Sequence, residues 1–234
     1  MNNMLPCSAL ILAGGKGERI GGNKLFLYID GVLLAEPLIE KMSGIFDEVL
    51  LCVGNGETKI VLSALRPIIQ YYSVSLVEDS IRGRGPIEGL RAGLQTMRNK
   101  WGFLIGCDMP KPQEAIIRYM WNRTVNLSEE YKVSAARLDD NIMPLHAFYH
   151  KECLPHIESS IEQAESECDA DADGNELPRF KGVYGFNSKM KLKSFYYRTS
   201  ICVIEENELS VIPGWKSSFA GYNTDKELKS MCGF

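Results

Sequence analysis

A glycine-rich, cationic loop follows the first apolar run of the chain. The segment SALILAGGKGERIGGNK places five glycines between positions 14 and 22, and it carries Lys16, Arg19 and Lys24. Successive backbone N–H groups in such a turn form a concave receptor for anions, and neighbouring lysine and arginine side chains add charge-assisted hydrogen bonds. The pattern predicts that this loop binds a polyphosphate, with a solvent-exposed glycine turn as the alternative.

Two familiar phosphate-binding motifs do not fit this loop. The dinucleotide fingerprint G-x-G-x-x-G would begin at Gly15, but Ile20 stands where its third glycine belongs. The pattern G-x-x-x-x-G-K-[ST] would begin at Gly17, but Asn23 stands in the lysine position. If the loop binds phosphate, it therefore does so by a different motif.

Two aspartates stand directly after other apolar runs. Asp108 follows GFLIGC, and a carboxylate at the end of a buried strand is costly unless a positive group meets it. Magnesium fits this position because it takes one or two carboxylates together with substrate phosphates, whereas a cap of the next turn is the alternative. Asp79 follows VSLVE, and on its own an Asp-Ser pair is also typical of an ordinary turn.

Short apolar runs that could position these residues recur along the chain. They do not alternate with polar residues, which is typical of strands covered on both faces. We expect helices between the first four runs, one beginning near Pro37, one stopping around Pro67 and one over 86–100, and a further helix over 152–168. The expected strands lie at 8–13, 48–53, 74–77, 102–107, 133–138 and 144–149.

This alternation predicts a single α/β domain of Rossmann-like type, whose mostly parallel central sheet is flanked by helices. In such sheets ligands bind at the carboxyl ends of the strands, where the strand order reverses. We therefore expect the loops 14–24, 79–86 and 107–112 to meet at one edge and to form a site there.

Composition limits the class of protein. A formal net charge of −4 argues against a nucleic-acid partner, which needs a basic surface. Seven cysteines are scattered without a CxxC pair, which indicates reduced thiols in a cytoplasmic protein. No apolar segment approaches the roughly 20 residues that span a bilayer, so we expect no membrane partner.

Four segments together resemble one enzyme family. LAGGKGERIGGNK is similar to the signature LAGG-x3-R-x-G-x2-K of the molybdenum cofactor guanylyltransferases, relatives of the sugar-nucleotide pyrophosphorylases. VEDSIRGRGPIEGLRAGL, GCDMPKP and FAGYNTDKEL resemble three further family segments, ED-x6-GP-L-x-G-x3-L, CD-x-P and F-x-N-x-N-T-P-E-D-L. The resemblance touches most of the chain outside about 165–195, and it implies a fold like that of the nucleotide-diphospho-sugar transferases.

The resemblance implies an activity and site residues. GMP would pass from GTP to the phosphate of the molybdenum-molybdopterin cofactor, with Mg²⁺ as the metal, and a delivery protein could bring the pterin. Lys24 would hold the phosphates, Asp108 would hold Mg²⁺ at the α-phosphate, and Asp79 would lie on the nucleoside side. Arg19, by its charge, could clamp the leaving phosphates. The remaining implied contacts are made to the nucleotide by Leu12, Ala13, Gly14 and Gly15, and on the acceptor side by Asn223.

The chain departs from the family pattern at Glu88, where a small residue is common, at Gly221 in place of the first closing asparagine, and at Asp225 in place of proline. A cytidylyltransferase for the same cofactor, a sugar-phosphate nucleotidyltransferase and a non-catalytic nucleotide-binding protein remain open.

The expected organisation is one domain over 1–234. Its nucleotide-binding half covers about 1–110 and its acceptor half about 111–234, with an acidic insertion near 165–182. DADADG in that insertion is similar to the start of a calcium loop, but Phe180 stands where the bidentate glutamate belongs, so we expect a solvated loop. His146 and His150 are interpreted as strand and surface residues.

Overall fold

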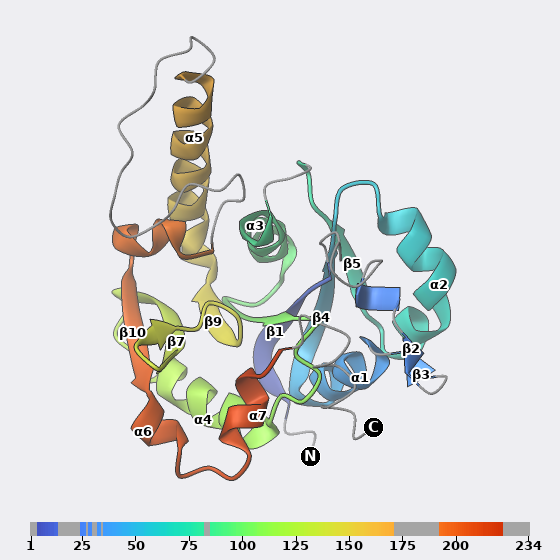
Figure 1. The fold of residues 1–234 in the computed structure, drawn as a ribbon, viewed down its shortest axis with the longest axis horizontal. Helices are drawn as coiled ribbons and strands as arrows, with labels where there is room; N and C mark the ends of the chain where they lie inside the picture. Colours follow the sequence, from blue (N-terminus) through green and yellow to red (C-terminus); the bar gives the residue numbers. More distant parts are fainter. Residues whose placement is uncertain are drawn as a thin grey trace.

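The structure is a computed structural model that describes residues 4–13, 24–26, 28–29, 32–33, 35–81, 85–170 and 192–221. Figure 1 shows a central sheet with helices on both of its sides. The strands are β1 (Leu5–Leu12), β2 (Tyr28–Ile29), β3 (Val32–Leu33), β4 (Phe46–Val53), β5 (Ser75–Glu78), β6 (Trp101–Gly106), β7 (Tyr131–Leu138), β8 (Asn141–Ile142), β9 (Ala147–His150) and β10 (Ser200–Glu205). The α-helices are α1 (Ala35–Ile45), α2 (Thr58–Tyr71), α3 (Pro86–Thr96), α4 (Glu114–Val125), α5 (Leu154–Ala170), α6 (Glu206–Leu209) and α7 (Trp215–Phe219). Short 3-10 turns are η1 (Lys24–Phe26), η2 (Lys151–Cys153) and η4 (Leu192–Arg198).

Strand β1 lies near the centre of the main sheet. The strand order is β10-β7-β9-β6-β1-β4-β5, and β8 pairs with β7. The chain first moves from β1 through β4 to β5 on one side, and α3 then carries it across to β6 on the other side of β1. The order reverses between β1 and β6, which is where sheets of this type bind their ligands.

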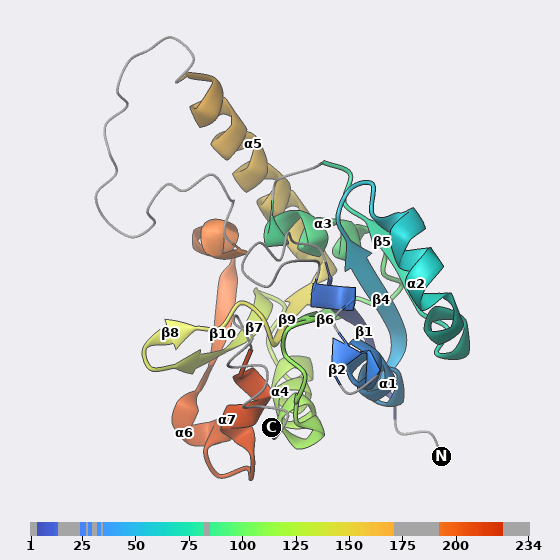
Figure 2. The same cartoon turned by 45° about the vertical axis from the view of Figure 1, so that its right-hand side comes forward.

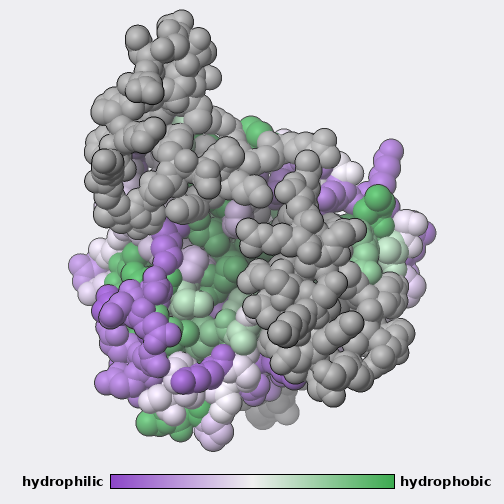
Figure 3. All heavy atoms as spheres, in the orientation of Figure 1, coloured by the Kyte–Doolittle hydropathy of each residue, from purple (hydrophilic) through white to green (hydrophobic). Residues whose placement is uncertain are grey.

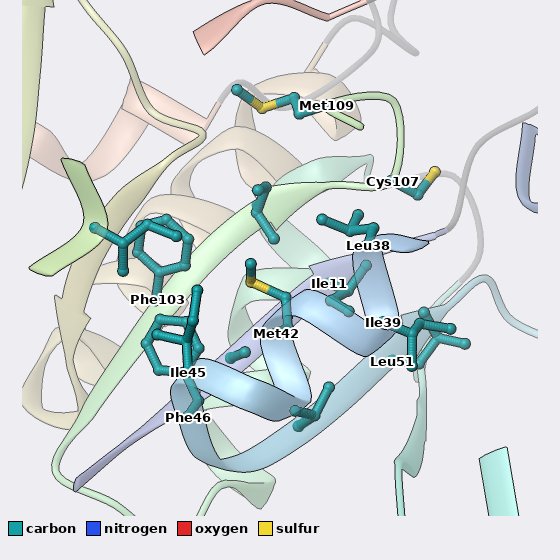
Figure 4. Close-up of a cluster of buried hydrophobic side chains, with 14 of the residues drawn as sticks. Ile11, Leu38, Ile39, Met42, Ile45, Phe46, Leu51, Phe103, Cys107 and Met109 are labelled. Atoms are coloured by element: carbon teal, nitrogen blue, oxygen red, sulfur yellow. The ribbon is translucent and has the colours of Figure 1, made fainter. Parts of the chain in front are cut away.

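Two apolar layers fix the helices on the sheet. Side chains alternate along β1, so Ile11 faces the layer under α1, α2 and α4, and Leu10 faces the layer under α3 and α5. Figure 2 shows α3 and α5 on one side of the sheet and α1 and α4 on the other. Figure 4 shows Leu38 and Met42 of α1 packed over the strands. Fully burying a side chain of this size contributes about 1.5–3 kcal/mol, so these layers hold the strand ends in place.

The predicted α/β class with a mostly parallel sheet is confirmed, and each of the six expected strands is present within a few residues. Strand β9 differs in direction: it lies antiparallel between β6 and β7. Strand β10 was not expected, and it extends the sheet parallel to β7. In the expected helix over 86–100, the apolar residues that helical spacing puts on one stripe are buried: Ile87, Leu90, Leu94 and Met97.

The prediction that a helix stops around Pro67 is wrong. Helix α2 continues to Tyr71 with Pro67 inside it. Proline removes one backbone N–H donor, but the turn that follows places Ile69 in the core, only 8% exposed. Burial of that apolar turn offsets the missing hydrogen bond. Helix α1, in contrast, begins at Ala35, so Pro37 lies in its first turn, where proline is tolerated.

Three cysteines beside apolar runs serve as small core residues. Cys7, Cys52 and Cys107 are buried, and burial raises the pKa of the Cys7 and Cys52 thiols. Of the helices in the described part of the chain, none is long and apolar enough to cross a membrane.

Candidate active site

The carboxyl ends of four parallel strands meet at one edge of the sheet. Hydrogen bonds continue the strand pairing one residue further, from Ala13 N to Cys52 O at 2.8 Å and from Cys107 N to Leu12 O at 3.0 Å. Asp79 N donates in the same way to Val53 O at 2.9 Å. This edge therefore brings together the ends of β1, β5 and β6, as the sequence predicted.

Asp108 is held in a tight turn after β6. Met109 N donates to Gly106 O at 3.0 Å, and the Asp108 carboxylate folds back over Gly106, where a Cβ would collide with Oδ1. A Cβ on Gly221 would lie 3.4 Å from Asp108 O and 3.9 Å from its Cγ. The segment that follows α7 thus passes directly beside the aspartate, and Figure 4 shows Cys107 and Met109 on either side of this turn.

Asp79 lies at the end of β5 against the start of α3. Its Oδ1 is buried and has no hydrogen-bond partner among the described residues. Burial, followed by the nearby carboxylate of Glu88, raises the pKa of Asp79 to about 7. Asn55 Nδ2 donates to Asp79 O at 3.0 Å and fixes the backbone there. An orphaned carboxylate oxygen at a strand end indicates a site that a ligand completes.

Gly89 allows α3 to approach this edge closely. A Cβ at position 89 would lie 2.7 Å from Leu12 Cδ2 and 3.6 Å from Asp79 Oδ1. Helix α3 begins after Gly85, whose φ of 73° lies in the left-handed region, and Pro86 occupies its first turn. These residues place the first turn of α3 beside Leu12 and Asp79.

A buried ion pair also stabilises the first turn of α3. It was not predicted from the sequence. Glu88 is fully buried, and Arg91 donates to it twice, from Nε at 3.1 Å and from Nη2 at 2.7 Å. Ser80 Oγ also donates to Glu88, at 2.8 Å. The spacing of Glu88 and Arg91, three residues apart on a helix, was visible in the sequence and could have predicted the pair. Together these contacts connect α3 to the residue that follows Asp79.

A cavity of about 370 Å³ lies against α7 and the turn between β7 and β8. Its lining includes aromatic, carboxylate and lysine side chains. Figure 3 shows that this side of the molecule also has a hollowed apolar area over β9. Six of the lining residues are Asp139, Asn141, Met143, Trp215, Lys216 and Phe219.

The structure describes some of the predicted site residues and not others. Leu12 and Ala13 lie between Asp79 and Asp108, so the structure brings these four positions to one edge. Lys24 opens the turn η1. The other predicted contacts lie outside the described residues: Gly14, Gly15, Arg19 and Asn223. The acidic motif at 169–174 also lies largely outside them.

The donor set fits a divalent ion that arrives with a nucleotide. Among the described residues there is no group of three or more histidine, cysteine, aspartate or glutamate side chains that could hold a metal by itself. Asp108 offers a single carboxylate beside the edge where phosphates would lie. Magnesium is bound in this manner, by one or two carboxylates together with substrate phosphates.

A parallel sheet with a strand-order reversal beside β1, an aspartate after β6 and a close helix start define a nucleotide-binding α/β protein. Comparison with known families agrees. Residues 9–172 match the MobA-like NTP transferase domain, and the chain belongs to this family.

Relatives of known name support that membership. A protein of Methanosarcina acetivorans named probable molybdenum cofactor guanylyltransferase is 27% identical over 97% of this chain and 90% of its own length. The molybdenum cofactor guanylyltransferase of Syntrophotalea carbinolica is 32% identical over 66% of this chain and 68% of its own.

Solved structures share the fold. The molybdopterin-guanine dinucleotide biosynthesis protein A of Archaeoglobus fulgidus has a TM-score of 0.71 at 20% identity, covering 96% of this chain and 98% of that one. A Mycobacterium tuberculosis protein solved as a complex with manganese has a TM-score of 0.52 at 15% identity, covering 85% and 87%.

Proposed function

We propose that this chain is a molybdenum cofactor guanylyltransferase. It would transfer GMP from GTP to the phosphate of the molybdenum-molybdopterin cofactor and release pyrophosphate. One observation carries the proposal: Asp79 and Asp108 flank the end of β1 at the reversal of strand order, in a chain of the MobA-like family. The names of the relatives supply the acceptor.

In the proposed reaction an oxygen of the acceptor phosphate attacks the α-phosphorus of GTP. The bond between that phosphorus and the bridging oxygen of pyrophosphate breaks, and pyrophosphate leaves with the electron pair. A phosphate monoester is largely ionised near neutral pH, so this attack needs no general base. Holding two anions in line supplies much of the rate increase.

The chain's own residues divide the work. Asp108 would hold Mg²⁺, which when bound neutralises charge on the phosphates. Lys24 would hold the phosphates, and Arg19 would neutralise the leaving group. Gly14 and Gly15 would offer backbone N–H groups to the phosphates. Asp79 would face the nucleoside with its Oδ1, which lies beside the start of α3 and has no hydrogen-bond partner among the described residues.

The guanine edge would meet the backbone of Leu12, Ala13 and Gly14. On the acceptor half, Asn223 would lie near the pterin, since the segment that leads to it passes beside Asp108 at Gly221. The cavity against α7 offers aromatic side chains and a lysine for a flat, phosphorylated ring system. A cytoplasmic location and a pterin-delivery protein complete the proposal, and the buried reduced thiols of the core are consistent with the former.

Pyrophosphate release tests the proposal. The full chain is incubated with Mg²⁺ and GTP, CTP or UTP, with and without molybdopterin cofactor. We expect release that depends on both GTP and the cofactor. Faster turnover of CTP would make the chain a cytidylyltransferase, and release with a sugar phosphate instead of the cofactor would indicate the other branch of the superfamily.

A matched pair of variants tests the site. Asp108→Asn should lower turnover by about 10²-fold or more, because the metal loses its carboxylate. Glu129→Gln changes an exposed carboxylate just before β7, at the opposite end of that strand from the cavity against α7, and it should leave turnover unchanged. Equal turnover in the two variants would remove Asp108 from the mechanism.

A further inference from the structure

Three segments distant in sequence meet at Asp108. The first is the connection 107–113, which carries the aspartate. The second precedes β9, where Leu145 Cδ1 lies 3.4 Å from the position of a Cβ on Gly106, next to the carboxylate. The third is α7 with the residues that follow it, including Gly221. The geometry of Asp108 therefore depends on how these segments are held to each other.

One buried chain of hydrogen bonds joins all three. His146, directly after Leu145, contacts Ser218 Oγ of α7 through its Nε2 at 2.7 Å. The same Ser218 oxygen accepts a hydrogen bond from Gln113 N at 2.9 Å, at the end of the connection from Asp108. His146 and Ser218 are both fully buried. Buried hydrogen bonds of this kind hold elements in one arrangement, because water cannot replace them.

The backbone and ring of His146 are fixed from several directions. Its φ of 63° is in the left-handed region, which is uncommon for a residue with a side chain, and its N–H donates to Leu104 O at 2.7 Å. The ring packs edge to face on Phe103 at 4.9 Å and lies 4.4 Å from Phe219. A strained backbone at a buried position persists only where the surroundings determine it.

The hydrogen bonds also indicate the tautomer. If Ser218 donates to Nε2, its oxygen still accepts from Gln113 N, and one group, Nδ1–H, lacks a partner among the described residues. If Nε2 donates instead, both the Ser218 hydroxyl hydrogen and Nδ1 lack partners in the described part of the chain. The first arrangement leaves fewer polar groups unsatisfied. Burial lowers the pKa of His146 to about 3, so the ring stays neutral at neutral pH.

We propose that His146 is a positioning residue: through Ser218 it fixes the connection 107–113 and the segment at Gly221, and so holds Asp108 in the arrangement that receives the nucleotide's divalent ion. The inference rests on the proposed function only in assigning the ion to Asp108. His146 itself touches neither nucleotide nor ion.

Manganese binding tests this role without the pterin acceptor. Mn²⁺ is titrated into the full chain with saturating GTP, and free Mn²⁺ is read by electron paramagnetic resonance. Ser218→Ala removes both hydrogen bonds of this hydroxyl, so it should raise the Mn²⁺ dissociation constant by about fivefold, while metal-free GTP binding stays within about twofold. Thr124→Val is the matched control, because Thr124 is buried in α4 and donates to Met120 O at 2.7 Å. It should lower stability without changing the Mn²⁺ constant.

A measurement on the unmodified chain covers the case in which Ser218→Ala fails to fold. Coupling between sites is reciprocal, so the ion must protect the link as much as the link favours the ion. Hydrogen exchange of the Gln113 amide should slow by about fivefold when Mg²⁺ joins bound GTP. Unchanged exchange, or an equal rise of the Mn²⁺ constant in Thr124→Val, overturns the proposal. If Mn²⁺ binding changes as stated but the chain transfers no GMP, the proposed function is wrong and the positioning role still holds.

Discussion

Replacing Asp79 by asparagine should stabilise the protein, and more so as the pH rises. In the folded chain the pKa of Asp79 is raised from 3.8 to about 7, first by burial and then by Glu88. Between these two pH values the unfolded chain has lost the Asp79 proton while the folded chain still holds it. The stabilising contribution of Asp79 is therefore fully present below pH 4 and is lost as the pH rises through about 7.

The size of the effect follows from the same pKa values. A difference of this size corresponds to at most about 4 kcal/mol. Because the carboxyl is only partly buried and solvent screens its charge, we expect about half of that, near 2 kcal/mol. Asparagine retains the shape and does not ionise, so at pH 8 the variant should be more stable than the natural chain by about that amount.

Urea unfolding of both proteins at pH 5 and pH 8 measures this difference. Asp79→Asn should show a much larger gain at pH 8 than at pH 5, and the exposed Asp140→Asn should show little change at either. A gain that is the same at both pH values would mean that Asp79 does not titrate in this range, and the reasoning from its burial would fail.

Two further changes test the start of α3. Gly89→Ala should weaken GTP binding, since the added carbon would lie 2.7 Å from Leu12 Cδ2 and the leucine side chain must move at the edge where the nucleotide would lie. Its effect on stability should stay within about 1 kcal/mol, because alanine favours the helix and so offsets the contact. Calorimetric unfolding and a GTP titration measure both, and an unchanged GTP affinity would separate this contact from the site. Arg91→Met should cost about 3–5 kcal/mol because it removes the guanidinium that compensates the buried charge of Glu88, whereas adding Glu88→Leu should restore most of that loss; thermal unfolding of the single and double variants decides, and a double variant no better than the single one would contradict this account.

Much of the fold could be predicted because local patterns determine it. Short apolar runs between amphipathic stretches fix the parallel part around β1, and the stripe on α3 follows from helical spacing alone. The continuation of α2 past Pro67 could not be predicted, since it depends on the burial of Ile69 against distant strands. The direction of β9 and the pairing of β10 could not be predicted either, because an apolar run does not indicate which strand it pairs with or in which direction.

The site was predictable where a residue directly follows a strand. Asp79 and Asp108 could be placed at one edge because parallel strands end together. The contact between His146 and Ser218 joins residues 72 positions apart, and nothing in the local sequence of either residue indicates it. His146 was expected to be an ordinary strand residue, but it precedes β9 and has a left-handed backbone.

Strand β9 has a mechanical consequence for the two halves of the sheet. It is hydrogen-bonded to β6 on one side and to β7 on the other, so the hydrogen-bonded strands run without interruption from β5 to β10. Swinging one half toward the other would require breaking several ladder bonds at once. If the chain binds two substrates as proposed, any closure around them would therefore come from the loops at the edge of the sheet, because the sheet itself is rigid.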